Sequence, residues 1–74
     1  MIQVPINEKE NLYVTFTDDC EPNAGGFYCE IYNELEENVD NFVIHKEDLP
    51  NSDYNEKMKI AKNLAFNYVI DSLR

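Results

Sequence analysis

Apolar residues recur at every second position in the first part of the chain and at a helical spacing in the last twenty residues. Residues 12–17, 27–33 and 40–45 alternate in this way, which is typical of strands with one buried face. Over residues 54–73 the apolar positions gather on one side of a helical wheel. The change of period predicts an α+β fold: a three-stranded antiparallel meander covered on one face by a single C-terminal helix, in the order βββα.

The connections leave some of the topology open. Residues 2–6 also alternate, but Pro5 cannot donate to a sheet ladder, so this run is expected to be a short edge strand or an arm. A tight hairpin centred on Ala24 and Gly25 would set Cys20 opposite Cys29, at a separation that allows them to pair. A wider loop would change that register.

The helix is expected to have two apolar stripes. Its N-cap is Ser52 or Asp53, and Asp53 has capping-box spacing to Glu56. The stripe predicted to face the sheet, flanked by Ile60 and Leu64, consists of Tyr54, Met58, Ala61, Ala65, Tyr68 and Val69. A second stripe of Phe66, Ile70 and Leu73 is either covered by the N-terminal arm or is the contact surface of a dimer.

Length and composition predict one small folded domain spanning residues 1–74. A domain of this size buries only ~60 % of the surface that its unfolded chain exposes. The hydrophobic content of 43 % is too high for a disordered acidic chain. No apolar run approaches the ~18 residues of a membrane span, and the N-terminus lacks the basic residues of a signal peptide. A cytoplasmic protein with two reduced cysteines is therefore expected.

Charge is the strongest indication of a partner. The net charge is −9, and residues 1–54 hold thirteen acidic residues against two lysines, whereas residues 55–74 are slightly basic. This field disfavours direct binding to nucleic acid. It suits either simple solvation of the surface or docking on a protein with a basic surface, where carboxylates would take the place of phosphates.

The residues expected to carry such binding lie in the β part of the chain. Acidic residues supply the electrostatic attraction, and tyrosines on the outer sheet face supply large amphipathic anchors. Tyr13, Tyr28 and Tyr32 are predicted to share that face, with Thr15 and Glu30 between them. The predicted contact set is Asp18, Asp19, Tyr28, Glu30, Tyr32, Glu34, Glu36 and Glu37.

No catalytic, metal or cofactor site is predicted. The chain has only two serines, Ser52 and Ser72, and Gly25-Gly26 precedes a strand rather than a helix, which is unlike a phosphate-binding loop. Cys20, Cys29 and His45 are too few to complete a zinc site. The acidic run from Asp18 to Asn23 lacks the glycine and the closing glutamate of a calcium loop.

Residue usage suggests a source. Residues with AT-rich codons (Phe, Tyr, Met, Ile, Asn and Lys) number 32, against nine with GC-rich codons (Gly, Ala, Arg and Pro), which points to a low-GC bacterium or to a phage or mobile element living in one. The sequence thus favours a non-catalytic inhibitor that resembles DNA and occupies the nucleic-acid-binding surface of a host protein. The alternative is a small structural or regulatory homodimer.

Overall fold

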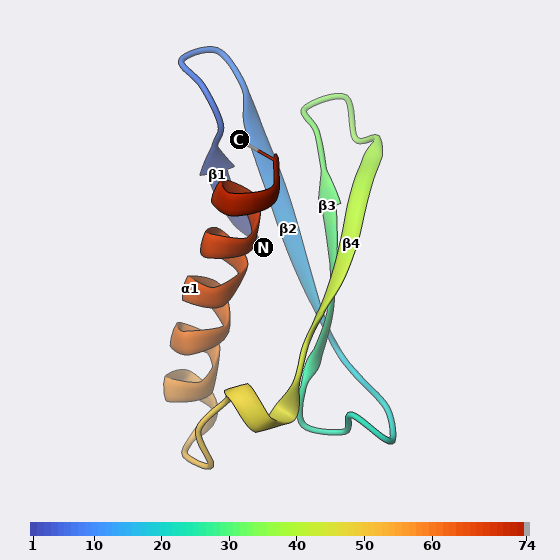
Figure 1. Cartoon of the computed structure of the whole chain (residues 1–74), viewed down its shortest axis with the longest axis vertical. Helices are drawn as coiled ribbons and strands as arrows, with labels where there is room; N and C mark the ends of the chain where they lie inside the picture. Colours follow the sequence, from blue (N-terminus) through green and yellow to red (C-terminus); the bar gives the residue numbers. More distant parts are fainter. Residues whose placement is uncertain (74) are drawn as a thin grey trace.

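The computed structural model describes residues 1–73, which form one antiparallel sheet and one long helix. The strands lie in the sheet in chain order: β1 (Ile2–Pro5), β2 (Asn11–Asp18), β3 (Phe27–Tyr32) and β4 (Asn38–Ile44). A single 3-10 turn, η1 (Lys46–Asp48), then leads to helix α1 (Tyr54–Leu73) (Figure 1). The predicted α+β fold is confirmed, and residues 2–5 add a fourth strand at the edge beside β2.

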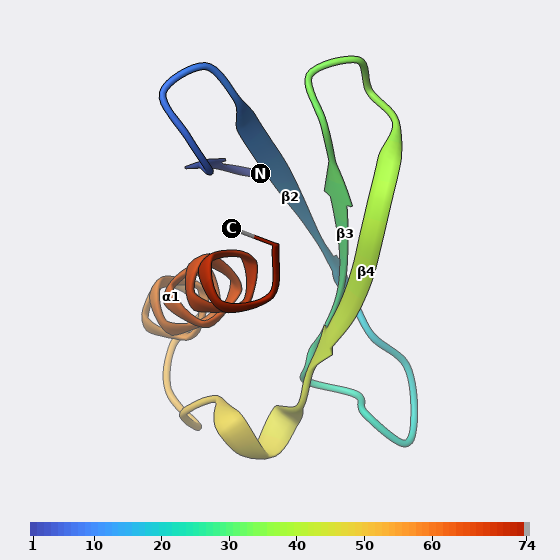
Figure 2. The ribbon, with the colours of Figure 1, turned by 45° about the horizontal axis from the view of Figure 1, so that its top comes forward.

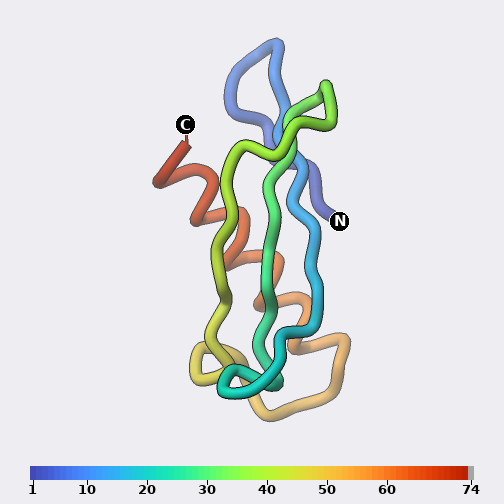
Figure 3. Tube along the Cα trace, turned by 90° about the vertical axis from the view of Figure 1, so that its right-hand side faces the viewer, coloured from blue at the N-terminus to red at the C-terminus, as the bar shows by residue number. Residues whose placement is uncertain are grey.

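The helix covers only one face of the sheet. In Figure 2, α1 lies inside the curve that the strands make, and no helix or strand of residues 1–73 lies on the convex side. Figure 3 views that convex side directly, with β2, β3 and β4 side by side in front of the helix. The same strands therefore have an inner face against α1 and an outer face toward solvent.

The inner face forms the core because apolar residues alternate along each strand. Val14, Cys29 and Ile31 are completely buried there. Phe16 and Phe27 meet edge to face, and Lys57 of the helix places its ammonium 5.0 Å from the centre of the Phe27 ring. The remaining buried core residues are Val4, Leu12, Phe27, Ile44, Ala61, Ala65 and Val69.

The helix begins where the sequence predicts. The Asp53 carboxylate accepts a hydrogen bond from the Glu56 backbone N–H at 2.8 Å, as an N-cap residue does. The small residues Ala61 and Ala65 are fully buried and allow a close approach to the sheet. The expected place of Tyr54 on the buried stripe is wrong. Its side chain is 63 % exposed, because the helix packs apolar side chains on the core only from Met58 onward.

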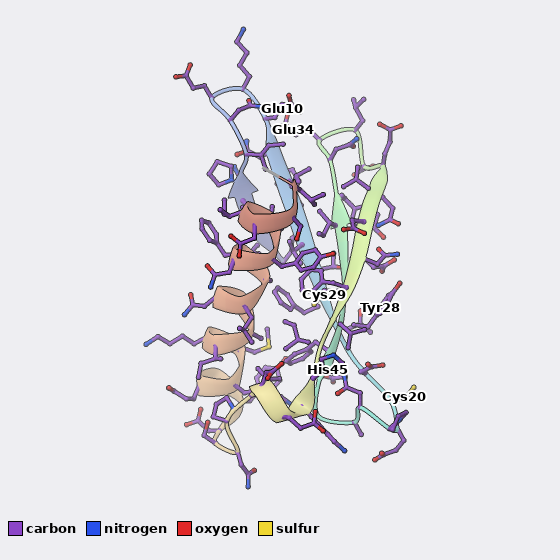
Figure 4. The ribbon with its side chains drawn as sticks, viewed as in Figure 1. Glu10, Cys20, Tyr28, Cys29, Glu34 and His45 are labelled. Atoms are coloured by element: carbon purple, nitrogen blue, oxygen red, sulfur yellow. The ribbon has the colours of Figure 1, made fainter. Side chains whose placement is uncertain are left out.

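The loop between β2 and β3 is wider than the predicted hairpin. The register sets Cys29 opposite Phe16, and Cys20 lies in the loop beyond the end of β2. Cys20 is exposed and Cys29 is buried, so the expectation that they are cross-strand neighbours is wrong (Figure 4). The register differs from the predicted one by four residues, an even number, and for that reason the inner and outer faces were assigned correctly.

Asn23 holds the wide loop in place. Its amide donates to the Asp19 carboxylate at 2.9 Å and to the Ile44 carbonyl at 3.1 Å, and its side-chain oxygen accepts the Lys46 N–H at 2.9 Å. These bonds join the β2–β3 loop to the end of β4. A loop fixed in this way needs no tight turn at Ala24-Gly25.

Strand β4 also differs from its predicted bounds of 40–45. It starts at Asn38, because a bulge leaves Val39 as an extra residue between the pairs Ile31–Asp40 and Tyr32–Asn38. It ends at Ile44, and His45 is the residue before η1.

Candidate functional site

Tyrosines, threonines and one glutamate face outward from β2 and β3. The register places Tyr13 opposite Tyr32 and Thr15 opposite Glu30. Tyr28 lies on the same face, four residues from Tyr32, which is ~13 Å along a strand. Figure 4 shows Tyr28 on the side of the sheet away from α1, and Cys29 between the sheet and the helix. The predicted tyrosine face is therefore present, and its two directly paired members are Tyr13 and Tyr32.

An open hollow of about 460 Å³ lies beside this tyrosine pair. Its lining comes from the chain start, from β2, from the end of β3 and from the β3–β4 loop. The lining residues are Met1, Tyr13, Thr15, Tyr32, Asn33, Glu34 and Glu36. This volume is in the range of sites that bind small ligands or single side chains. We call it the tyrosine hollow.

The β3–β4 loop forms the acidic rim of the tyrosine hollow, and Asn33 shapes that loop. The Asn33 side-chain oxygen accepts the N–H groups of Leu35 and Glu37, both at 2.9 Å. Its amide donates to the Glu37 carboxylate at 2.9 Å. Glu36 has a φ of 63°, in the left-handed region that tight loops use. The rim is thus a fixed turn rather than a loose acidic run.

Hydrogen bonds from Asn11 fix the position of the Glu34 carboxylate. Its Oε1 atom accepts two hydrogen bonds from Asn11 at the start of β2, one from the backbone N–H and one from the side-chain amide, each at 3.1 Å. Glu10 of the β1–β2 loop lies at the same end of the molecule (Figure 4). Within residues 1–73, neither Oε2 of Glu34 nor the Glu36 carboxylate accepts a hydrogen bond. As carboxylate oxygens they can accept hydrogen bonds from a cationic ligand.

The environment of Tyr32 disfavours ionisation of its phenol. Burial raises the pKa of Tyr32 above its ordinary value of 10.0, and the nearby Glu30 charge raises it further. A neutral phenol keeps its O–H donor and an aromatic ring with an electron-rich face at physiological pH. The site therefore combines aromatic rings with carboxylate side chains at its rim.

The predicted contact residues do not form one surface. The molecule is 37 Å long, and the loop that carries Asp19 lies at the opposite end from the loop that carries Glu34 (Figure 1). Asp18 pairs with Phe27, five residues along β3 from Tyr32, or ~17 Å. Tyr32, Glu34 and Glu36 meet at the hollow. Tyr28 and Glu30 lie between the two ends.

Asp19 has a structural role in its loop. One of its oxygens accepts the Cys20 N–H and the other accepts the Asn23 amide, both at 2.9 Å. The hydrogen bond from Asn23 lowers the pKa of Asp19, and the bond from Cys20 and the charge of His45 act in the same direction. Its lone pairs are occupied by its own loop, which leaves fewer of them for a partner.

Sequence reasoning missed five residues at or beside the hollow. Tyr13 and Thr15 were placed on the outer face but were not counted as contact residues, and Met1 and Asn33 were not considered as such. Leu35, at the tip of the acidic loop, is 80 % exposed. A lone leucine between glutamates in a turn is the sequence signal that could have identified it.

The second helical stripe is mostly covered. Ile70 and Leu73 pack against the core, together with Ile2 and Ile6 from the start of the chain. Phe66 is 42 % exposed. The predicted dimer surface is therefore left with one exposed large apolar side chain out of three, which weakens the argument for a homodimer through this stripe.

The opposite end of the molecule has a hollow of a different character. Its volume is about 410 Å³, and Lys46, Glu47 and Lys57 contribute to its lining. Two ammonium groups there favour anions over cations. The two hollows differ in their charged side chains: the tyrosine hollow has two glutamates and no lysine in its lining, and the other hollow has two lysines and one glutamate.

Three further findings concern metal binding, the reactivity of Cys29 and membrane-spanning helices. In residues 1–73, no group of three His, Cys, Asp or Glu side chains is arranged to hold a metal ion. Burial raises the pKa of the Cys29 thiol to about 12, so it stays protonated and unreactive. Within the same residues, no helix has both the length and the apolar character needed to cross a membrane.

Comparisons of the chain with protein-family models, with curated proteins and with solved structures found no match.

Proposed function

We propose that the chain is a non-catalytic acidic binding module that docks its outer sheet face on a basic surface of a partner protein. One observation supports this most directly: the tyrosine pair and the acidic rim meet at a preformed hollow on the face that the helix leaves open. Aromatic side chains are enriched among the residues that dominate binding energy. Carboxylates around them attract and orient a basic partner.

The partner's basic surface is, on this proposal, one that binds nucleic acid. Such surfaces carry clustered Lys and Arg residues that neutralise phosphates, and a dense array of carboxylates competes for the same residues. A net charge of −9 exceeds the magnitude of roughly 2–8 that keeps a small domain soluble. The excess supports a binding role, and the low-GC composition supports an inhibitor carried by a phage or mobile element.

Affinity capture with a charge-reversed variant tests the proposal. The triple change Glu34→Lys, Glu36→Lys and Glu37→Lys reverses the rim of the hollow. The matched control, Glu47→Lys, Asp48→Lys and Asp71→Lys, makes the same change in net charge on exposed residues elsewhere. All three chains are immobilised and exposed to lysate of a low-GC bacterium, and bound proteins are eluted with salt or with duplex DNA.

The expected result is a nucleic-acid-binding protein that the original chain and the control retain and that the rim variant loses. Its elution should begin at moderate salt because the exposed charges are screened, and duplex DNA should displace it. If the rim variant and the control retain the same proteins equally, or if DNA displaces nothing, the proposed function is wrong.

A further inference from the structure

We propose that the tyrosine hollow is a pocket for an arginine side chain of the partner, whose guanidinium packs on Tyr13 and Tyr32 and binds the carboxylates of Glu34 and Glu36. The inference rests on the proposed function and adds the chemical group that the site recognises. It makes the hollow the centre of the interface and the other acidic residues its surroundings.

The charge of the lining selects a cation. Glu34 and Glu36 supply two carboxylates to the lining, against the single backbone ammonium of Met1, so the lining is negative overall. An anion would meet two carboxylates, and a neutral apolar group would leave them partly desolvated without a partner. A cationic side chain removes both costs.

The aromatic pair selects a flat cation over a compact one. Residues directly opposite on neighbouring antiparallel strands have Cβ atoms ~4.5–5.5 Å apart, so the Tyr13 and Tyr32 side chains leave the sheet as neighbours. A guanidinium is planar, weakly hydrated and stacks on aromatic faces, whereas an ammonium is compact and strongly hydrated. Arginine is therefore the better occupant of the two basic side chains.

The carboxylates are positioned before any ligand arrives. The two bonds from Asn11 hold Oε1 of Glu34, and its Oε2 remains able to accept a guanidinium N–H. Asn33 fixes the turn that carries Glu36. Preorganised groups lose little conformational entropy on binding, which favours affinity for a single side chain.

A short peptide tests the pocket without knowledge of the partner. The probe is acetyl-Gly-Gly-Arg-Gly-Gly-amide, and the matched control replaces Arg with citrulline, which has nearly the same shape and no charge. Chemical shifts of the backbone amides and the tyrosine rings are followed by NMR during titration. A single side chain should bind with a Kd on the order of 10 mM, given typical ligand efficiencies.

The expected shifts are confined to the rings of Tyr13 and Tyr32 and to the amides of residues 33–36. The citrulline peptide should bind at least about tenfold more weakly, and a lysine peptide should bind more weakly than arginine by several-fold. Equal binding of the arginine and citrulline peptides would overturn the proposal. So would shifts at residues 46–48 as large as those at the hollow.

Variants distinguish binding of the peptide in the tyrosine hollow from general electrostatic attraction to an acidic protein. The pair Glu34→Gln and Glu36→Gln removes the two charges but keeps an oxygen that can accept from Asn11, so the loop stays folded. It should weaken arginine binding at least about tenfold. The control pair Glu47→Gln and Asp48→Asn should leave the Kd within about twofold. Equal losses in both pairs would mean that net charge alone attracts the peptide, and that the hollow is not the site.

The two proposals fail in different ways. If the rim reversal abolishes capture of a basic partner but the arginine peptide does not shift the hollow, the proposed function stands and the arginine pocket is wrong. If the peptide binds the hollow but no nucleic-acid-binding protein is captured, the pocket stands and the proposed function is wrong.

Discussion

The two faces of the sheet use alternate residues of the same strands for different purposes. Cys29 and Ile31 of β3 are fully buried against the helix, whereas Glu30 and Tyr32, their neighbours in sequence, face outward, and Tyr32 lines the tyrosine hollow. A change on the inner face removes packing, and a change on the outer face removes only side-chain contacts with water and with neighbouring strands. In a domain this small, one face therefore sets stability and leaves the other available for binding.

The cysteines give the largest expected difference between the inner face and the exposed loops. Cys20 should react promptly with a thiol reagent, and Cys29 should react about 100- to 5,000-fold more slowly. Cys29 is buried and its pKa is raised to about 12, so it reacts only when the domain unfolds, at a free-energy cost of ~3–5 kcal/mol. Timed labelling at pH 8, followed by mass spectrometry of peptides, measures both rates.

The control for this measurement is the same reaction in urea, where both thiols should react at similar rates. Equal rates without urea would mean that the helix does not protect the inner face, and the comparison between the two faces would lose its basis.

Neighbouring residues of β3 give the next largest effect. Ile31→Ala should cost about 2–5 kcal/mol in the free energy of unfolding, because it empties a fully buried site. Tyr32→Ala should cost less than about 1 kcal/mol, because the half-buried side chain loses only its cross-strand pairing with Tyr13 and its hydrogen bond with Glu30. Urea denaturation followed by circular dichroism compares them.

Since Ile31→Ala leaves little residual stability, Ile31→Val serves as the measurable variant, with an expected cost of about 0.5–1.5 kcal/mol. A Tyr32→Ala cost equal to or above that of Ile31→Ala would show that the outer face is part of the core.

Gly26 lies at the end of the β2–β3 loop, where Asn23 and the end of β4 pack closely against it. It lies next to Phe27 and is buried, and a Cβ at this position would clash with the Asn23 amide and the Ile44 carbonyl. Gly26→Ala should therefore cost about 1–3 kcal/mol, as overpacking does. Combining it with Asn23→Ala should not restore stability, because the Ile44 carbonyl remains in the way. A neutral effect of Gly26→Ala in the urea experiment would contradict the fixed position of this loop.

The sequence predicted the faces of the sheet but not the register of its hairpins. Period-two alternation fixes which side chains are buried, and it tolerates any even shift in pairing. The four-residue shift that separates Cys20 from Cys29 depends on hydrogen bonds of the Asn23 side chain to Asp19 and Ile44. Ile44 lies 21 positions further along the chain, and no local pattern reveals such a contact. The bulge at Val39 was not predicted for the same reason, because no local sequence pattern reveals it.

The candidate site was partly predictable for a related reason. Tyr32, Glu34 and Glu36 were identified because their residue types suit a basic partner, and they do meet at one hollow. Asp18 and Asp19 were grouped with them on charge alone, but strand length places them at the other end of the molecule. Composition predicts which groups a site uses, whereas topology decides which of them meet.

Tyr68 gives the smallest effect and shows where the inner face admits a polar contact. Its ring stacks on Phe42 with centroids 4.1 Å apart, and its hydroxyl donates to the Asp40 carboxylate at 2.9 Å. Tyr68→Phe keeps the stacking and removes the hydrogen bond, so it should cost about 0.5–1 kcal/mol at pH 7.

The bond to Asp40 raises the pKa of Tyr68 above its ordinary value of 10.0. Because the folded-state pKa is the higher one, this stabilisation is fully present below pH 10 and is lost as the pH rises through the folded-state pKa. Urea titrations of both chains between pH 7 and pH 11 should therefore show a difference that is constant to about pH 9 and then shrinks. A difference that persists unchanged at pH 11 would assign the effect to packing rather than to the hydroxyl.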